Sequence, residues 1–382
     1  MGRIKKISGE VGNFLKKIAE KIKNIPKKAK VIIIVVAAVI AAAAAVCIIL
    51  LSQTLGRMNR IEDNQPSEVL MTIKKPCVFL LEEAQAEKER EDMEAEQAEA
   101  QRRAQEEAEA EIRKKLEGVD IDVMREDYVK NILLIGQDKR SYEDEPQRSD
   151  SMIIASINTR TNKITLCSLM RDMYVSIPGY KDNRINEAYQ YGGMELLDQT
   201  IEENLGVHID GNVEVDFEGF KEIFSVIGDI EIDIKDYEVN HLNKIDDSWN
   251  ITEGVNMLNG EQALAYARTR KVGNSDWERT DRQRRVLSAA FDKVKDLDVF
   301  SMISLASKIS PYITTDINTK EFLGYAYIVA TNHMSLGENY RFPAEGHYSC
   351  QTLRKGMEVL VPDLEANAQL LKECLYGEGS GL

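Results

Sequence analysis

The sequence, 382 residues long, contains few histidines and cysteines, the side chains that most often bind transition metals. Its five cysteines, at positions 47, 77, 167, 350 and 374, show no metal-binding spacing. They leave Cys350 and Cys374 as the pair suited to a disulfide across the C-terminal segment. The four histidines lie outside every motif described below, so we assign them no role in catalysis.

A net positive charge occurs at the N-terminus and not in the rest of the chain. Residues 1–30 carry ten Lys or Arg against two Glu, a net charge of +8, whereas the whole chain carries −15. The remaining residues therefore carry −23. Such an acidic body argues against nucleic acid as a partner, because binding to phosphates requires a basic surface.

A membrane span is predicted by the uncharged run from Val31 to Leu51, which at roughly 1.5 Å per residue is long enough to cross a bilayer. The basic residues before it indicate a cytosolic N-terminus, with the rest of the chain outside the cell. A cleaved signal peptide is the minor alternative, because the run stays apolar to its end. The basic stretch also resembles a nucleic-acid arm, but beside a span it more often sets topology and contacts anionic lipids.

Residues 82–117 contain no proline or glycine and are rich in Glu, Ala, Gln, Lys and Arg. Pairs of opposite charge four residues apart, such as Glu99 with Arg103 and Glu111 with Lys115, favour a solvated helix on the order of 50 Å long. The apolar stripe is mostly alanine, which is too weak for a coiled coil. We therefore expect a lone charged helix or a frayed stalk.

The folded domain is expected at residues 128–376, and the part from Val299 onward is treated as belonging to it. Before it come the basic tail (1–30), the span (31–51) and the linker with the stalk (52–127); residues 377–382 form a flexible tail. Strand-like runs occur at 131–136, 151–157, 164–169 and 230–234, and helical patterns at 188–205, 217–226, 260–268 and 278–297. This alternation predicts an α/β fold, a three-layer α/β/α sandwich with a mixed central sheet.

Charged residues follow or precede three of these strands. Asp138 comes directly after the first, Arg148 and Asp150 come before the second, and Arg171 and Asp172 close the third. Arginine binds phosphate oxygens in pairs, and two carboxylates can share the divalent cation that such oxygens carry. Each segment alone is compatible with an ordinary polar turn, but the convergence of three strand ends favours a diphosphate site.

Further polar candidates lie at the ends of helices. Arg184 and Asn186 open one helix, where the alternative is a cap with an exposed arginine. Arg268 and Arg270 end the helix at 260–268, where they could instead complement the helix dipole.

A third group shares one face of the next helix. Arg279, Arg282, Gln283 and Val286 fall at positions i, i+3, i+4 and i+7. Arginines rarely share an apolar stripe without an anion or a carboxylate as partner. We therefore prefer a ligand site to a solvated helix face.

These separated motifs, in this order, resemble the LytR-CpsA-Psr family over residues 128–297. The matching segments are Asp138 with Arg140, Arg148 to Asp150, Arg171 with Asp172, Asn186 to Tyr189 with Gly192 and Gly193, Leu258 to Arg270, and Arg279 to Gln283. The departures are Ser151 for a common threonine, Leu169 and Met170 for a common Ile-Pro, and Arg184 for a common lysine. The last keeps the charge but changes how a phosphate is bound.

The resemblance implies an extracytoplasmic phosphotransferase of a Gram-positive cell envelope. Such enzymes take an anionic glycopolymer from a polyprenyl diphosphate carrier and attach it to peptidoglycan through a phosphodiester, with little demand beyond positioning and charge stabilisation. The family fold also surrounds an apolar groove for the polyprenyl tail, which Phe217, Phe220 and Phe224 are candidates to line. For most of these rings, however, packing on the sheet is the role that we prefer.

Roles carry over to matching positions. Asp138 and Asp150 are expected to bind Mg²⁺ (or Mn²⁺), and Asp138 or Asp172 is the candidate base for the acceptor hydroxyl. The catalytic set also contains Arg148 and Arg171. The residues expected to bind the substrate diphosphate and its surroundings are Arg140, Arg184, Asn186, Arg268, Arg270, Arg279, Arg282 and Gln283.

Two other readings stay open at this point. The same site with water as acceptor would be a hydrolase that releases polyprenyl phosphate. A non-enzymatic envelope sensor or regulator would bind the lipid without needing the metal carboxylates. The polymer, teichoic acid or capsule, is not encoded in any recognisable motif.

Overall fold

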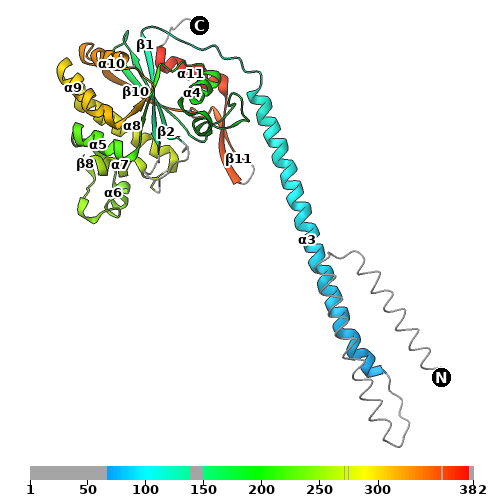
Figure 1. Ribbon diagram of the computed structural model, residues 1–382. Helices are drawn as coiled ribbons and strands as arrows, with labels where there is room; N and C mark the ends of the chain where they lie inside the picture. Colours follow the sequence, from blue (N-terminus) through cyan, green and yellow to red (C-terminus); the bar gives the residue numbers. More distant parts are fainter. Residues whose placement is uncertain (1–66, 138–148, 271, 274, 354–355, 378–382) are drawn as a thin grey trace, which may run out of the picture. The chain divides into compact units, whose positions relative to one another are not determined.

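The computed structural model describes residues 67–137, 149–270, 272–273, 275–353 and 356–377 (Figure 1). The chain divides into two compact units, residues 1–104 and residues 105–382. The predicted span at 31–51 and the basic tail lie outside the described residues. Within the described ranges, no helix has both the length and the apolar character needed to cross a bilayer.

The predicted charged spacer is a helix, α3 (Ser67–Leu116), which begins upstream of the expected start. Arg103 pairs with Glu99 at 2.7 Å, and Lys115 with Glu111 at 3.3 Å, as the spacing predicts. The C-terminal end of α3, however, is not a free stalk. Ile112 and Leu116, four residues apart on one face, are buried in the core of the second unit.

A six-stranded mixed sheet forms the centre of the second unit, in the order β10-β3-β2-β1-β6-β9. The predicted hairpin is confirmed: β2 (Ser149–Asn158) pairs antiparallel with β3 (Lys163–Leu169), and β1 (Val129–Gln137) pairs antiparallel with β2. β6 (Gly211–Val215) is parallel to β1, β10 (Ser335–Phe342) is parallel to β3, and the short β9 (Thr314–Thr315) is antiparallel to β6. The segment after Val299 therefore contributes strands to the main sheet.

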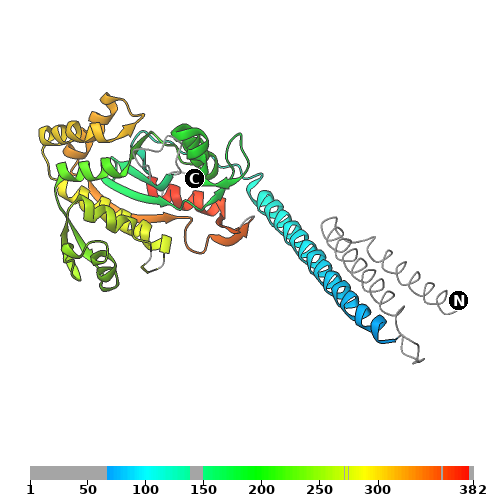
Figure 2. The ribbon, with the colours of Figure 1, turned by 60° about the horizontal axis from the view of Figure 1, so that its bottom comes forward.

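Helices cover both faces of this sheet (Figures 1 and 2). On one face α4 (Ile185–Leu205) and α11 (Leu364–Tyr376) pack in the cluster that contains Leu133 and Ile154. On the other face α8 (Ser275–Val294) and α10 (Thr319–Thr331) pack in the cluster that contains Ile153 and Leu166. Successive side chains of a strand point to opposite faces, so strands covered on both sides are apolar throughout. A mixed sheet between helical layers agrees with the predicted α/β architecture.

A third cluster packs beside the sheet. It contains α5 (Phe217–Ile227), β7 (Ile230–Ile234), α6 (Asp236–Asn243), β8 (Gly254–Leu258) and α7 (Gly260–Arg268). The predicted strand at 230–234 is present, but it pairs with β8 in a separate two-stranded ladder. The remaining elements include α9 (Val299–Ile309) and two further ladders, β4 (Tyr174–Val175) with β5 (Asn183–Arg184) and β11 (Tyr348–Leu353) with β12 (Met357–Pro362).

The expected disulfide between Cys350 and Cys374 is wrong in this structure, because both are free thiols. Cys350 is exposed on the β11–β12 ladder, whereas Cys374 lies on α11 and packs against the core. Burial raises the pKa of the Cys374 thiol to about 11. A half-buried thiol with such a raised pKa reacts slowly because little thiolate forms near neutral pH.

Candidate functional site

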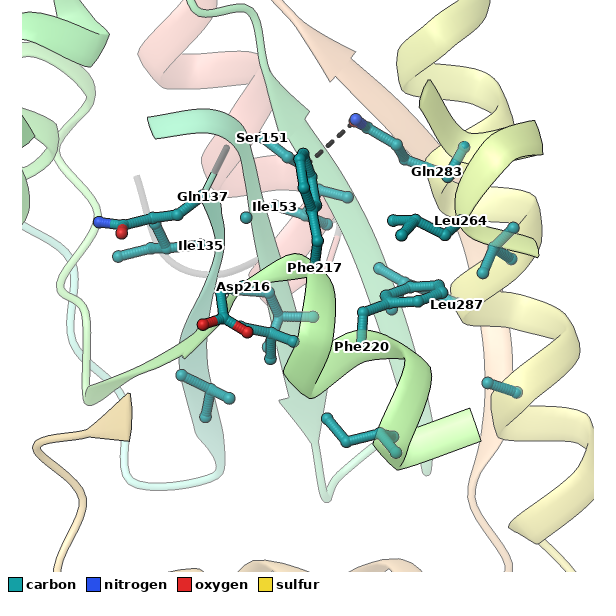
Figure 3. Close-up of a pocket in the computed structure, with 18 of the residues that line it drawn as sticks. Ile135, Gln137, Ser151, Ile153, Asp216, Phe217, Phe220, Leu264, Gln283 and Leu287 are labelled. Carbon is teal, nitrogen blue, oxygen red and sulfur yellow. Dashed lines mark hydrogen bonds between the residues drawn. The ribbon is translucent and has the colours of Figure 1, made fainter. Parts of the chain in front are cut away.

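A cavity of about 480 Å³ lies between the central sheet and helices α5, α7 and α8 (Figure 3). Ile135 on β1 and Ile153 on β2 contribute to it from the sheet. Phe220, Leu264 and Leu287 contribute to it from the three helices. Each helix is amphipathic and directs its apolar stripe toward the sheet, so the cavity is enclosed mostly by hydrocarbon.

The central sheet is irregular beside the cavity, at the end of β1. The register between β1 and β2 shifts between Gly136 and Gln137, which is a β-bulge. Gly136 lies opposite Ser151, and a Cβ atom at position 136 would stand only 3.0 Å from the Ser151 Cβ. Glycine therefore permits the close approach of the two strands beside the cavity.

The predicted polar residues that line the cavity are Asp150, Arg268, Arg270, Arg279 and Gln283. Asp150 contacts both Arg270 and Arg279, so these three residues form a polar end of the cavity. Ser151 Oγ donates to Gln283 Oε1 at 3.1 Å, which links β2 to α8 (Figure 3). This serine replaces the threonine common in the family, and it keeps the hydroxyl. We call this end of the cavity the arginine mouth.

Asp150 is the centre of the ion pairs at the arginine mouth. Its Oδ1 accepts from Arg171 Nη1 at 2.8 Å, and its Oδ2 lies 3.4 Å from Arg270 Nη2. Its side chain keeps 31% of its surface exposed. A carboxylate held by two arginines and still open to solvent can exchange these contacts for a ligand and its cation.

Asp276 is a second carboxylate at the arginine mouth, and the sequence analysis assigned it no role. Its oxygens lie 3.2 Å from Arg171 Nη2, 3.1 Å from Arg279 Nη1 and 3.8 Å from Arg270 Nε. Its position three residues before Arg279 on a helix was the available signal, because residues at i and i+3 are neighbours. Asp276 therefore holds three arginines close together.

Arg279 has too few partners for its burial. Its side chain is 3% exposed, yet its Nε and Nη1 have no hydrogen-bond acceptor among the described residues. The contact of Nη1 with Asp276 lacks hydrogen-bond geometry, and Nη2 reaches the Asp150 carbonyl only at 3.5 Å. Burial lowers the pKa of Arg279 to about 10; Asp276 opposes this effect, and Arg270 and Arg171 add to it. A buried cation beside two others, with donors that have no acceptor among the described residues, is chemically suited to bind an anion.

Arg171 and Arg184 continue the charged network away from the cavity. Asp172 accepts from Arg184 Nη1 at 3.0 Å and lies 3.4 Å from Arg171 Nε. Glu187 accepts from Arg184 Nη2 at 3.1 Å. Burial lowers the pKa of Arg171, but the carboxylates of Asp172, Asp276 and Asp150 outweigh it and raise the pKa overall. Asp172 thus orients two arginines, a role that differs from that of the free base expected from the sequence.

Asn186 is fully within the fold, 2% exposed, and does not line the cavity. Its Oδ1 has no hydrogen-bond partner among the described residues. It is the second residue of α4, two positions after Arg184 in the sequence.

The surroundings of Arg282 correct the prediction that this residue binds the diphosphate. Its side chain is 1% exposed, and Nε donates to Glu238 Oε1 at 2.7 Å. The remaining groups donate to Glu278 at 2.8 Å and to the carbonyls of Thr269 and Val272 at 2.9 and 3.1 Å. Arg282 therefore ties α8 to α6 and to the end of α7, and it is not available to a diphosphate. One helical turn separates it from Arg279, and this turn changes its surroundings completely.

The remaining candidates, Asp138, Arg140 and Arg148, lie outside the described residues. Their expected roles stay predictions.

The interior of the cavity is apolar beyond the arginine mouth. Phe220 and Phe224 stack with ring centroids 4.5 Å apart, and Arg268 lies over the Phe217 ring at 3.8 Å. Phe217, Phe220 and Phe224 all line the cavity, whereas the sequence analysis preferred packing on the sheet for most of these rings. A ligand for this site therefore needs an anionic head and a hydrocarbon tail.

A divalent cation fits the chemistry of the arginine mouth in one coordination mode. No group of three or more His, Cys, Asp or Glu that could hold a metal occurs among the described residues. Mg²⁺, however, commonly takes one or two protein carboxylates and completes its octahedron with phosphate oxygens and water. Asp150, open to solvent at the mouth, is suited to this mode.

The sequence profile of the LytR_cpsA_psr family matches residues 90–373. The chain belongs to this family. Among curated relatives, the polyisoprenyl-teichoic acid–peptidoglycan teichoic acid transferase TagU of Enterococcus faecalis is 37% identical over 177 residues, or 46% of this chain and 56% of that protein. TagU of Oceanobacillus iheyensis is 32% identical over 245 residues, or 62% of this chain and 72% of that protein. The match to the first thus spans little more than half of the relative's length.

Solved structures of the family share the fold. Bacillus subtilis TagV superposes with a TM-score of 0.53 at 27% identity, covering 66% of this chain and 99% of that chain. A structure of TagT bound to LI-WTA gives a TM-score of 0.55 at 25% identity, covering 67% of this chain and 96% of that chain. The mixed sheet with helices on both faces is therefore the architecture of the LytR_cpsA_psr family.

Proposed function

We propose that this chain transfers an anionic glycopolymer, of teichoic acid or capsule type, from a polyprenyl diphosphate carrier to peptidoglycan. The observation that carries the proposal is one cavity with two chemically different ends. Arg270 and Arg279 provide positive charge at the arginine mouth, and phenylalanine and aliphatic side chains line the interior. A lipid diphosphate has the same two parts. The TagU relatives are named as teichoic acid transferases, which agrees with this assignment.

The reaction is a substitution at phosphorus. A hydroxyl oxygen of the acceptor forms a bond to the polymer-linked phosphorus, and the bond from that phosphorus to the bridging oxygen of the diphosphate breaks. Polyprenyl phosphate leaves with the bonding electrons, and the hydroxyl proton passes to a base, for which Asp138 is the expected residue. Arg171, Arg270 and Arg279 stabilise the negative charge on the diphosphate oxygens as it develops. Asp172 and Asp276 position these arginines.

Mg²⁺ belongs to the proposal, with Asp138 and Asp150 as its protein ligands and Mn²⁺ as a substitute. When bound, the cation would neutralise charge on the phosphate oxygens and make phosphorus more electrophilic. Asp150 would then have to exchange its contacts with Arg171 and Arg270 for the metal. These arginines would turn to the diphosphate, which supplies the acceptors they lose.

The location of the protein is also part of the proposal. The run from Val31 to Leu51 would anchor the chain in the cell membrane, with the basic N-terminus in the cytosol and the catalytic domain outside. The donor lipid, the membrane and the peptidoglycan acceptor would then all be within reach of one chain. Nucleic acid is not an expected partner of so acidic a domain.

The test uses the full chain in detergent micelles, a synthetic polyprenyl diphosphate saccharide and peptidoglycan oligomers, with Mg²⁺ or with EDTA. The proposal predicts a metal-dependent, phosphodiester-linked product, detected by mass spectrometry. Release of a free sugar phosphate with no linked product would instead identify a hydrolase. Donor binding without turnover under all conditions would identify a sensor.

A further inference from the structure

Two tyrosines outside the cavity form an exposed aromatic surface. Tyr180 and Tyr191 stack with ring centroids 4.8 Å apart and an interplanar angle of 16°. They stay 53% and 38% exposed, respectively, although they pack against each other. Each ring therefore keeps one face toward its partner and presents its other surface to solvent. We call this pair the tyrosine platform.

The platform is held in place by the local backbone and by hydrogen bonds. Asn183 Nδ2 donates to the Tyr191 hydroxyl at 2.9 Å, and Asn183 Oδ1 accepts from the Arg184 amide at 2.9 Å. Tyr191 lies directly before Gly192 and Gly193, where α4 departs from helical geometry and Gly193 has φ of 66°. Only a residue without a Cβ adopts this conformation readily, so the break in the helix is built into the sequence. An exposed pair of rings with this much support is preorganised.

The platform is joined to the arginine mouth by an unbroken series of contacts. Asn183, which holds Tyr191, precedes Arg184 in β5. Arg184 donates to Asp172, Asp172 lies against Arg171, and Arg171 donates to Asp150 at the arginine mouth. The contacts between side chains in this series are all 3.4 Å or less, and Asn183 and Arg184 are joined through the backbone. The platform is therefore linked to the arginine mouth through Asn183 and the charged network of Arg184, Asp172 and Arg171.

We infer that the tyrosine platform binds the glycan chain of the acceptor, a saccharide, by stacking against its sugar rings. This inference rests on the proposed function, because it names where the acceptor of that reaction lies. The C–H face of a pyranose is apolar and flat, so it packs on an aromatic ring, while its hydroxyl and amide groups stay hydrated or take hydrogen bonds. Tyrosine suits this role because it combines an apolar ring with a polar hydroxyl.

The hydroxyl of Tyr191 adds a polar contact to the platform. Its oxygen accepts the hydrogen bond from Asn183, and no acceptor for its own hydrogen is seen among the described residues, so it can donate to a saccharide oxygen. The neighbouring Arg184 replaces a lysine common in the family, and its guanidinium is fixed by Asp172 and Glu187. The glycan would thus be aligned by the two rings, and its reacting hydroxyl would be directed along the contact series toward Asp150.

The test measures binding of the full chain, in detergent micelles, to insoluble peptidoglycan by co-sedimentation and to a soluble N-acetylglucosamine oligomer by calorimetry. The double variant Tyr180→Ala/Tyr191→Ala is expected to weaken binding about tenfold or more, the usual loss when aromatic anchors are removed. Tyr180→Phe is expected to bind like the wild type, because the ring is kept. Tyr327→Ala is the matched control: Tyr327 is 55% exposed on α10, and its loss should not change binding.

A second readout uses the wild-type protein and does not depend on the folding of a variant. Nitration of tyrosine by tetranitromethane should be slowed at positions 180 and 191 by the oligomer, and unchanged at 327. Equal protection at all three positions, or unchanged binding by the double alanine variant, would overturn the inference. Binding is measured without donor, so failure of polymer transfer would contradict the proposed function and leave this result standing by itself.

Discussion

Arg279 and Arg282 lie one turn apart on α8, and their guanidinium groups have opposite surroundings. Arg279 reaches the arginine mouth and lacks acceptors for Nε and Nη1 among the described residues. Arg282 is enclosed by Glu238, Glu278 and two backbone carbonyls. Arg279 therefore has donors that a ligand can use, whereas the donors of Arg282 bind acceptors within the protein. Substitutions of the two arginines should have different effects.

Replacement of Arg279 by glutamine should reduce transfer about 100-fold or more without loss of stability. The arginine stabilises charge on the phosphoryl group, and removal of one such donor typically costs this much in rate. The variant also removes a buried cation next to Arg171 and Arg270, which offsets the lost contacts. The measurements are kcat for transfer and the melting temperature. A large drop in Tm with normal kcat would assign Arg279 a structural role.

Replacement of Arg282 by glutamine should have the opposite pattern. Glu238 would be left charged at 1% exposure, and breaking such a buried pair costs about 3–5 kcal/mol of the free energy of unfolding. Urea unfolding would measure this loss. The double variant Arg282→Met/Glu238→Leu should recover most of it, because no charge is then buried. If the single variant unfolds like the wild type, the pair does not hold α8 to α6.

Replacement of Asp150 by asparagine should raise the Mg²⁺ concentration needed for half-maximal transfer, because an amide binds the cation more weakly than a carboxylate. The contacts of Arg171 with Asp172 and Asp276 remain, so the arginine mouth should stay assembled. Asp216→Asn is a control, since Asp216 also lines the cavity but caps α5 through the Gly219 amide. An unchanged Mg²⁺ titration in Asp150→Asn would remove Asp150 from the metal site.

Asp198 should make stability depend on pH. Burial raises the pKa of this carboxyl to about 7; Asn212, which donates at 2.7 Å, opposes the shift, and Asp316 and Glu202 add to it. The folded state therefore holds a proton that the unfolded chain releases near pH 4, and stability falls as pH rises from about 4 to 7. Asp198→Asn should be more stable than the wild type at pH 8, on the order of 3 kcal/mol, and the difference should vanish near pH 4. Urea unfolding at both pH values is the measurement; equal differences would contradict the assignment.

Replacement of Phe220 by alanine should weaken binding of donors with long prenyl chains more than binding of short-chain analogues. Phe220 lines the apolar interior and stacks on Phe224, so its loss removes tail contacts and leaves the arginine mouth intact. Loss of a buried aromatic contact corresponds to about tenfold or more in affinity. Titration with donors of different chain length would test this. Equal loss for all lengths would show that the tail does not reach Phe220.

Much of the fold could be predicted because its signals are local. The hairpin of β2 and β3 follows from two apolar runs separated by a turn, and α7 follows from a helical pattern bounded by Asn259, whose side chain caps it. Which strands pair with each other was harder to predict. The strand at 230–234 has the correct alternation, but the sequence does not indicate that it pairs with β8 outside the central sheet.

Part of the site could also be predicted, because its motifs are local in the sequence. The motifs indicated Asp150, Arg171, Arg270 and Arg279, and the structure brings these four together. Asp276 was missed, and Arg282 was misassigned, because both depend on which side of α8 faces the cavity. A periodic pattern groups residues on a helix face, but a stripe wide enough to include Arg279 and Arg282 meets two different environments.

By itself, the sequence determined the chemical inventory of this protein: a basic tail, an apolar run, a charged helix, and an α/β domain with arginines and carboxylates at strand ends. These follow from composition and periodicity, which act over a few residues. The tertiary structure alone decided which charges face one another. Arg171 pairs with Asp150 and Asp276 from three separate elements, and Arg282 turns to Glu238, 44 residues away in the sequence. Such contacts depend on how packed helices and strands are placed in space, because the free energy of a buried charge is set by its neighbours in the fold.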